Sequence, residues 1–180
     1  MLTNDYVLFA AVFAAAGGIH IGFAIKKKQL TRDRIINMVF RWAFAGYLCF
    51  IAAVTLFPIT LPPYKETFIT PYINLDPGML FGYGDAYHMI VNIAGNLLLF
   101  APGVILGRLC RIKVLESWQS TLAAGAVTSV LIEVLQYCET MWGFSDVPRI
   151  SDINDVALNI AGAVIGWFAF RLFDKRKKSA

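Results

Sequence analysis

The feature that most constrains this chain is a series of long apolar runs. A helix needs about 20 mainly apolar residues to cross a bilayer. Five stretches have close to that length: residues 6–25, 40–61, 88–106, 118–138 and 152–173. The runs do not alternate apolar and polar residues, which excludes a membrane β-barrel. The sequence therefore predicts an all-α integral membrane bundle of about five transmembrane helices.

The composition supports this class. Hydrophobic residues make up 58% of the 180 residues and charged residues only 16%, against about 45–50% and about 25% in soluble domains. A scattered net charge of +4 argues against a nucleic-acid partner. Three cysteines without a CxxC pair exclude a disulfide framework and a zinc site.

The basic residues predict the orientation. Most of them fall on alternate loops: Lys26, Lys27, Lys28, Arg32, Arg34, Arg41, Arg108, Arg111, Lys113, Arg171, Lys175, Arg176, Lys177 and Lys178. Cytoplasmic loops of membrane proteins are enriched in Lys and Arg. We therefore expect the N-terminus outside, the C-terminus in the cytoplasm and an odd number of spans. The first run precedes its basic residues, so we interpret it as an uncleaved helix and not as a signal peptide.

Polar side chains occur at membrane depth in the third, fourth and fifth runs, within about two helical turns of the outer surface. Ionisable groups at such depth usually face a bundle interior or a cavity, and the spacing places each helix's set on one face. We predict one outward-facing polar pocket, with Arg149 as the natural partner of Glu133, Asp152 or Asp155. The predicted pocket residues are Asn92, Asn96, Glu133, Gln136, Arg149, Asp152, Asp155 and Asn159.

Three other features carry expectations about packing and the outer surface. Gly162 and Gly166 form a GxxxG pattern, which we expect to allow close packing within the bundle. Pro102 is expected to kink or end the third helix. The proline-rich loop 62–87 is expected to lie on the outer membrane surface and to include a short interfacial helix.

The second half of the chain resembles the VanZ-like family of small bacterial membrane proteins. The matching elements are Asn96-Leu-Leu-Leu-Phe-Ala-Pro102, Glu133-Val-Leu-Gln136 and a run from Arg149 to Gly166. The resemblance divides the chain into 1–44, an N-terminal transmembrane helix with a basic loop; 45–173, the VanZ-like membrane domain; and 174–180, a basic cytoplasmic tail. It also implies a location in the bacterial cytoplasmic membrane.

The resemblance implies little about chemistry. The founding member of the family is associated with resistance to the glycopeptide teicoplanin, by a mechanism other than the usual change of the peptidoglycan terminus. The resemblance marks Asn96, Glu133, Gln136, Arg149, Asp152, Asp155 and Asn159 as shared polar residues. It names no cofactor and no catalytic role.

Three functions fit these observations. The first is a protein that binds or handles a membrane lipid, a lipid-linked wall precursor or a lipoglycopeptide, with Arg149 holding a phosphate. The second is a membrane-embedded hydrolase or transferase that uses Glu133, Asp152 and Asp155 as general acid and base, or as oxygen ligands of Mg²⁺ or Ca²⁺ with Asn159. The third is a small lipid or ion transporter. The first is favoured. No cysteine nucleophile, histidine ligand pair or DDxxD-type metal run supports catalysis, and the inner halves of the runs carry almost no polar residues that could form a second, inward-facing pocket for transport.

Overall fold

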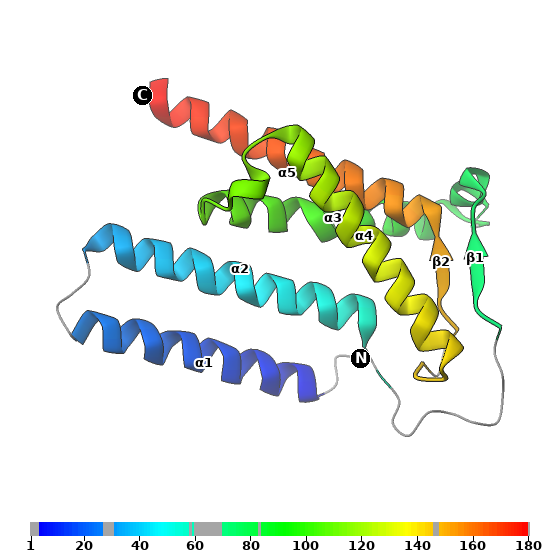
Figure 1. The fold of residues 1–180 in the computed structure, drawn as a ribbon, viewed down its shortest axis with the longest axis horizontal. Helices are drawn as coiled ribbons and strands as arrows, with labels where there is room; N and C mark the ends of the chain where they lie inside the picture. Colours follow the sequence, from blue (N-terminus) through cyan, green and yellow to red (C-terminus); the bar gives the residue numbers. More distant parts are fainter. Residues whose placement is uncertain are drawn as a thin grey trace.

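The structure is a computed structural model that describes residues 4–26, 31–57, 59, 70–82, 84–145 and 148–179, with side chains from 13 to 174. Five helices dominate it (Figure 1). They are α1 (Asn4–Lys26), α2 (Arg32–Leu56), α3 (Ala86–Leu109), α4 (Trp118–Met141) and α5 (Ile153–Ser179), with two 3-10 turns, η1 (Pro77–Phe81) and η2 (Lys113–Leu115).

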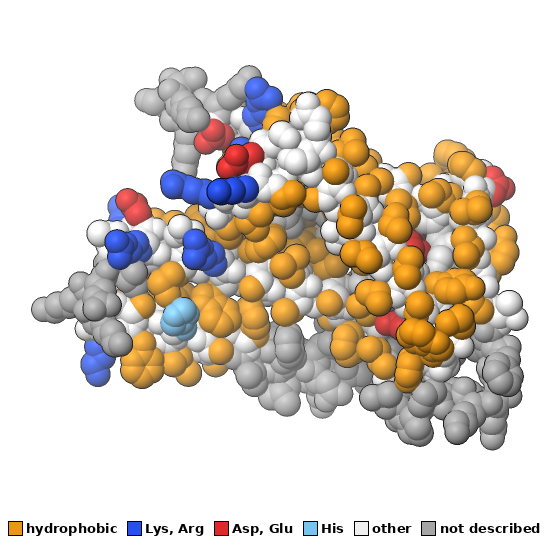
Figure 2. Space-filling model, viewed as in Figure 1, with side chains coloured by type: hydrophobic (Ala, Val, Ile, Leu, Met, Phe, Trp, Pro, Cys, Tyr) orange, Lys and Arg blue, Asp and Glu red, His pale blue; other side chains and the backbone are white. Residues whose placement is uncertain are grey.

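The helices confirm an all-α membrane bundle. Four of them, α2 to α5, are long and apolar enough to cross a bilayer, and α1 contributes a shorter apolar stretch, Phe13–Lys26, among the residues searched. Figure 2 shows apolar side chains over most of one face, while the Lys and Arg side chains on that face gather at the end where α1 joins α2. Which side of the membrane this end faces remains a prediction.

The second helix differs from its predicted bounds of 40–61. It begins eight residues earlier, directly after Thr31 in extended conformation, and ends at Leu56. Phe57 is extended, with φ −107° and ψ 155°. This follows from the sequence, since the residue before a proline, here Pro58, avoids the helical region. Hydropathy excluded the charged residues 32–34 from the predicted span, but they extend the helix on the N-terminal side of the apolar run.

The third helix runs through Pro102 and ends only at Leu109. Of the two expected effects of the proline, a kink or an end, the end is therefore wrong, and the kink stays a prediction. A proline inside a helix leaves the carbonyl four residues earlier without its amide partner. The Tyr47 hydroxyl of α2 donates to that carbonyl, on Leu98, at 2.9 Å and also lies 3.3 Å from the Leu99 carbonyl. A side chain from the neighbouring helix thus replaces the missing hydrogen bond.

We expect Tyr47→Phe to lower the free energy of unfolding by about 1 kcal/mol, because it leaves the Leu98 carbonyl without a donor. Unfolding in detergent by added SDS measures this loss. Tyr72→Phe is the matched control, since Tyr72 is 56% exposed on a strand outside the helices. Equal stabilities of the two variants would show that the hydroxyl does not support the proline-containing turn.

The tightest helix packing joins α3, α4 and α5. A Cβ atom on Gly162 would overlap the Leu97 carbonyl oxygen, and one on Gly166 would lie 2.5 Å from the Ala101 carbonyl oxygen. The GxxxG pattern therefore lets the backbones of α5 and α3 touch, as predicted for packing within the bundle. The core beside this contact is small, and its buried members are Phe100, Val104, Leu115, Ile132, Ala163 and Trp167.

Two short strands form at the end of the bundle where α4 ends and α5 begins (Figure 1). β1 (Tyr72–Asn74) pairs in parallel with β2 (Ile150–Asp152), and η1 follows β1. The strands were not predicted, because three-residue strands carry no periodicity. The short helix expected in the 62–87 loop corresponds to η1, while its position at the membrane surface stays a prediction. Residues 62–69 and 83 of that loop lie outside the described residues.

Candidate functional site

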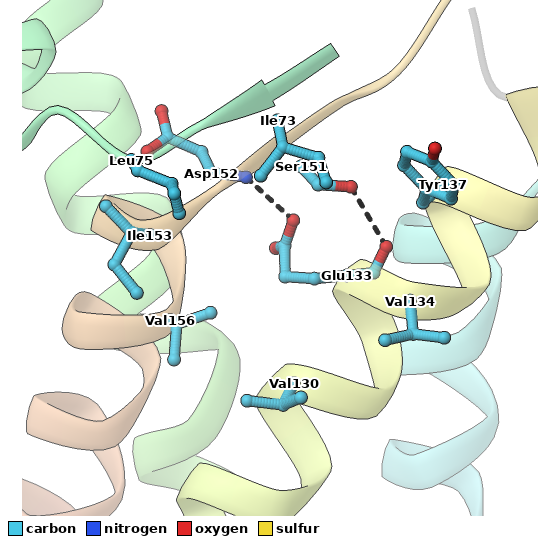
Figure 3. A pocket seen from close by; sticks show the side chains of 10 residues that line it. All are labelled: Ile73, Leu75, Val130, Glu133, Val134, Tyr137, Ser151, Asp152, Ile153 and Val156. Carbon is cyan, nitrogen blue, oxygen red and sulfur yellow. Dashed lines mark hydrogen bonds between the residues drawn. The ribbon is translucent and has the colours of Figure 1, made fainter. Parts of the chain in front are cut away.

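A cavity of about 260 Å³ opens between α4, α5 and the two strands. Its walls are mainly apolar, and Val130 and Val134 on α4 are about half exposed on the surface of the helix. Figure 3 shows the arrangement, with Glu133 between the α4 wall and the strand β2. The residues that line the cavity are Ile73, Leu75, Val130, Glu133, Val134, Tyr137, Ser151, Asp152, Ile153 and Val156.

Four polar residues line this cavity, Tyr137, Ser151, Asp152 and Glu133, and Glu133 lies between α4 and β2. Its side chain is only 8% exposed, and one carboxylate oxygen, Oε2, accepts a hydrogen bond from the Asp152 backbone N–H at 2.9 Å. The Ser151 hydroxyl donates to the Glu133 carbonyl at 3.0 Å. Both donors come from β2, so the strand fixes the position of Glu133. The second carboxylate oxygen, Oε1, has no hydrogen-bond partner among the described residues.

Asp152 has a different position from the predicted one. It lies at the end of β2 and not on the helix face shared with Asp155 and Asn159, so that expectation is wrong. Its Oδ1 accepts hydrogen bonds from the Asn154 backbone N–H at 2.8 Å and from the Asn154 side chain at 2.9 Å. The first bond caps the N-terminus of α5, whose first amides lack helical partners. Figure 3 shows the Asp152 carboxylate directed away from Glu133.

Asn92, Asn96 and Asp155 form a second polar group, between α3 and α5. Asn96 Nδ2 donates to Asp155 Oδ1 at 2.8 Å and to Asn92 Oδ1 at 2.9 Å, and Asn92 also hydrogen-bonds the Asp155 side chain. The two asparagines share a face of α3, as predicted from their spacing. The group joins two helices through a partly buried carboxylate and does not line the cavity.

Asn159 lies deeper in the bundle, between α5 and α4. The side chain is 2% exposed, and its Nδ2 donates to the Ser129 hydroxyl at 2.9 Å. Its Oδ1 is buried and has no hydrogen-bond partner among the residues that the structure describes. Hydrogen bonds of this kind between membrane helices stabilise their contact. Asn159 therefore connects α4 and α5 and is separate from the cavity.

Gln136 and Arg149 meet at the C-terminus of α2. Gln136 Nε2 donates to the Thr55 carbonyl at 2.8 Å, and Arg149 donates to the same carbonyl and, at 3.0 Å, to that of Phe57. These carbonyls end a helix, where a cation is favourable. Arg149 Nε also pairs with Glu139 Oε2 at 3.4 Å. The predicted pairing of Arg149 with Glu133, Asp152 or Asp155 is therefore wrong.

Two asparagines missed by the sequence analysis hold the outer wall of the cavity. Asn74, on β1, is 1% exposed and its Oδ1 accepts from the Asp76 backbone N–H at 3.0 Å. Asn154, at the start of α5, donates to the Asp76 carbonyl at 3.1 Å. Asn154 thus attaches the segment after β1 to α5. If Asp152 had been interpreted as the N-cap of a helix, Asn154 in the first turn of that helix could have been recognised.

Asp85 and His88 begin α3 and lie away from the cavity lining. Asp85 Oδ1 accepts from the His88 backbone N–H at 2.8 Å, and Oδ2 contacts the His88 ring at 2.8 Å. These hydrogen bonds favour the ionised form, so they hold the pKa of the Asp85 carboxyl below its usual value. Both side chains are exposed, and the pair is a helix cap.

The eight predicted residues therefore separate into several groups. Only Glu133 and Asp152 line the cavity, and α3 contributes no lining residue. Among the described residues, no three His, Cys, Asp or Glu side chains are placed to hold a metal ion together. The oxygen ligands considered for Mg²⁺ or Ca²⁺ are thus directed to different partners in the part of the chain that the structure describes.

Long apolar helices, closely packed through glycines and joined by buried amide and carboxylate contacts, define a multi-pass α-helical membrane protein. A family model described as VanZ/LLP1 matches residues 44–174, well over half of the chain. The chain therefore belongs to the VanZ-like family, which confirms the resemblance found in the sequence. No curated protein and no solved structure was found to match it.

Proposed function

We propose that this VanZ-like protein binds the chain of a cell-envelope lipid, or the lipid tail of a lipoglycopeptide, in the cavity between α4, α5 and the strands. The observation that carries the proposal is an apolar-walled cavity of about 260 Å³ beside a nine-tenths buried carboxylate, Glu133. Typical small-molecule pockets measure about 300–1,000 Å³. This cavity therefore suits a chain segment and a small polar end, and it is too small for a whole glycopeptide.

The surroundings of the cavity favour an occupant that arrives from the bilayer. Val130 and Val134 are 49% and 50% exposed on α4, a helix with the length and hydropathy of a membrane span. In a membrane, such side chains contact lipid. We place the cavity in the outer leaflet of the bacterial cytoplasmic membrane, from the distribution of basic residues. A lipid would then reach it laterally.

The contacts of Arg149 change the role that the sequence analysis expected for this residue. Its guanidinium contacts Glu139 and two α2 carbonyls, so we no longer assign it a ligand phosphate. No contact among the described residues specifically favours catalysis or transport. Ser151 uses its hydroxyl on the Glu133 carbonyl, and Asp152 uses its carboxylate as a helix cap. The proposal therefore stays with binding.

We expect Val134→Trp to abolish co-purification of lipid with the protein, because the indole would fill the cavity from its open side. Native mass spectrometry from detergent measures the bound lipid directly. Val127→Trp is the matched control: it lies seven residues earlier on α4, is 60% exposed and does not line the cavity. Unchanged lipid occupancy in Val134→Trp would contradict the proposal.

The same pair of variants tests the link to resistance. In a sensitive Gram-positive host, the wild type and Val127→Trp are expected to raise tolerance of teicoplanin but not of vancomycin, and Val134→Trp to lose this effect. Insertion of each variant is checked in membrane fractions. Protection that persists in Val134→Trp would separate resistance from the cavity.

A further inference from the structure

The apolar walls alone cannot make the cavity selective for one lipid over another. A lipid chain is already in an apolar environment in the bilayer, so moving it against Val130, Val134 and Val156 gains little from the hydrophobic effect. Selectivity must therefore come from the polar end of the cavity. The polar residues that line the cavity are Glu133, Tyr137, Ser151 and Asp152, and the hydrogen bonds of Glu133 determine which ligand chemistry its carboxylate can accept.

The hydrogen bonds around Glu133 leave an excess of acceptors. The two donors that β2 supplies, the Asp152 backbone N–H and the Ser151 hydroxyl, are both used by Glu133 itself. Oε1 has no partner among the described residues, and Figure 3 shows the carboxylate lying between α4 and the apolar side chains of α5. A carboxylate oxygen that lacks a hydrogen-bond partner beside an apolar cavity is costly unless a partner brings a donor or a positive charge.

The charges near the cavity have one sign. None of the ten described residues that line it is Lys, Arg or His. Asp152 and Asp155 both lie close enough to act electrostatically on Glu133. Arg149 is held at the C-terminus of α2 by Glu139 and two carbonyls. An anionic group placed beside Glu133 would therefore meet like charges, which disfavours binding.

We infer that the ligand places a hydrogen-bond-donating group, best a primary ammonium, against Glu133 Oε1, and that a phosphate does not enter this end of the cavity. This inference rests on the proposed function and names the class of polar end that the lipid carries. A lipid with a free amine near its chain satisfies it. A lipid phosphate, if present, stays outside, at the membrane surface.

Three amphiphiles with the same chain test the inference: dodecylamine, dodecyltrimethylammonium and dodecyl phosphate. Their dissociation constants are measured by native mass spectrometry on the full chain in a non-ionic detergent. We expect dodecylamine to bind the wild type about tenfold more tightly than dodecyl phosphate, with the quaternary ammonium between them because it has charge but no N–H.

Glu133→Gln identifies the group responsible. Its amide oxygen can still accept from the Asp152 N–H, so the fold is retained, and the melting temperature checks this. We expect the preference for dodecylamine over dodecyl phosphate to fall to about one. Glu116→Gln is the matched control, because Glu116 is exposed near the opposite end of α4 and should keep the full preference.

The outcomes separate the inference from the proposed function. Equal binding of all three probes, or tightest binding of the phosphate, would overturn the inference while the cavity remained a lipid site. Equal binding of the primary and quaternary ammonium would overturn the hydrogen-bond assignment. Absence of binding by every probe, with no lipid on the purified protein, would overturn both.

Discussion

Gly162→Leu is expected to separate α3 from α5 and to prevent folding of the membrane domain. The reason is steric: even a single Cβ at this position would overlap the Leu97 carbonyl oxygen, which belongs to the backbone and cannot turn aside. Gly162→Ala is therefore expected to lower the free energy of unfolding by about 3 kcal/mol, the upper end for overpacking. SDS-induced unfolding in detergent micelles measures the loss.

Gly95 provides the control for this prediction. It lies on α3, and a Cβ there meets no atom within 4 Å. Gly95→Ala is expected to leave stability unchanged or raise it by up to about 1 kcal/mol, since alanine is the better helix former. If Gly162→Ala were as stable as Gly95→Ala, the close approach of α3 and α5 would be incorrect.

Arg149→Met has the second-largest expected effect, a loss of about 3 kcal/mol in the free energy of unfolding. The substitution removes the donors to the Thr55 and Phe57 carbonyls and leaves Glu139 unpaired, although its Oε2 is buried. Adding Glu139→Gln is expected to restore more than half of the loss, because the uncompensated carboxylate is removed. Thermal melts in detergent compare the single and double variants.

Arg34→Met is the control, since Arg34 is exposed in the first turn of α2. It should change stability by less than about 0.5 kcal/mol. The alternative role of Arg149, holding a lipid phosphate, gives a different result. In that case Arg149→Met would keep its melting temperature and lose only the bound lipid, and the structural assignment would be wrong.

The membrane-spanning part of the fold could be predicted from the sequence because hydropathy determines it. The helices α2 to α5 lie on the four later apolar runs, although α2 ends at Leu56, before the predicted end of its run. Their ends could not be predicted in the same way. Thr31 and Phe57 bound α2 through local backbone preferences, and the continuation of α3 through Pro102 depends on Tyr47, which is 51 residues away from Leu98 in the chain.

The site was harder to predict, because the depth of a side chain in the membrane does not determine which residues it contacts. Asp152 was assigned to a helix face, although Asp-x-x-Asp before an apolar run is also a helix-start pattern. Glu139 was overlooked as an interface residue, yet it follows Gln136 by three residues and shares its face. Asn74 and Asn154 matter only because β1 reaches β2, a contact that no local pattern indicates.

The parallel pairing of β1 with β2 also sets an order of assembly. Tyr72 pairs with Ile150, so β1 leaves the ribosome 78 residues before its partner strand exists. During synthesis α3 and α4 are both made before β2 emerges and the pair can close. Contacts this distant in sequence form late and slowly. The cavity wall consequently closes only after α3, α4 and β2 have been made, and the cavity is a property of the completed chain.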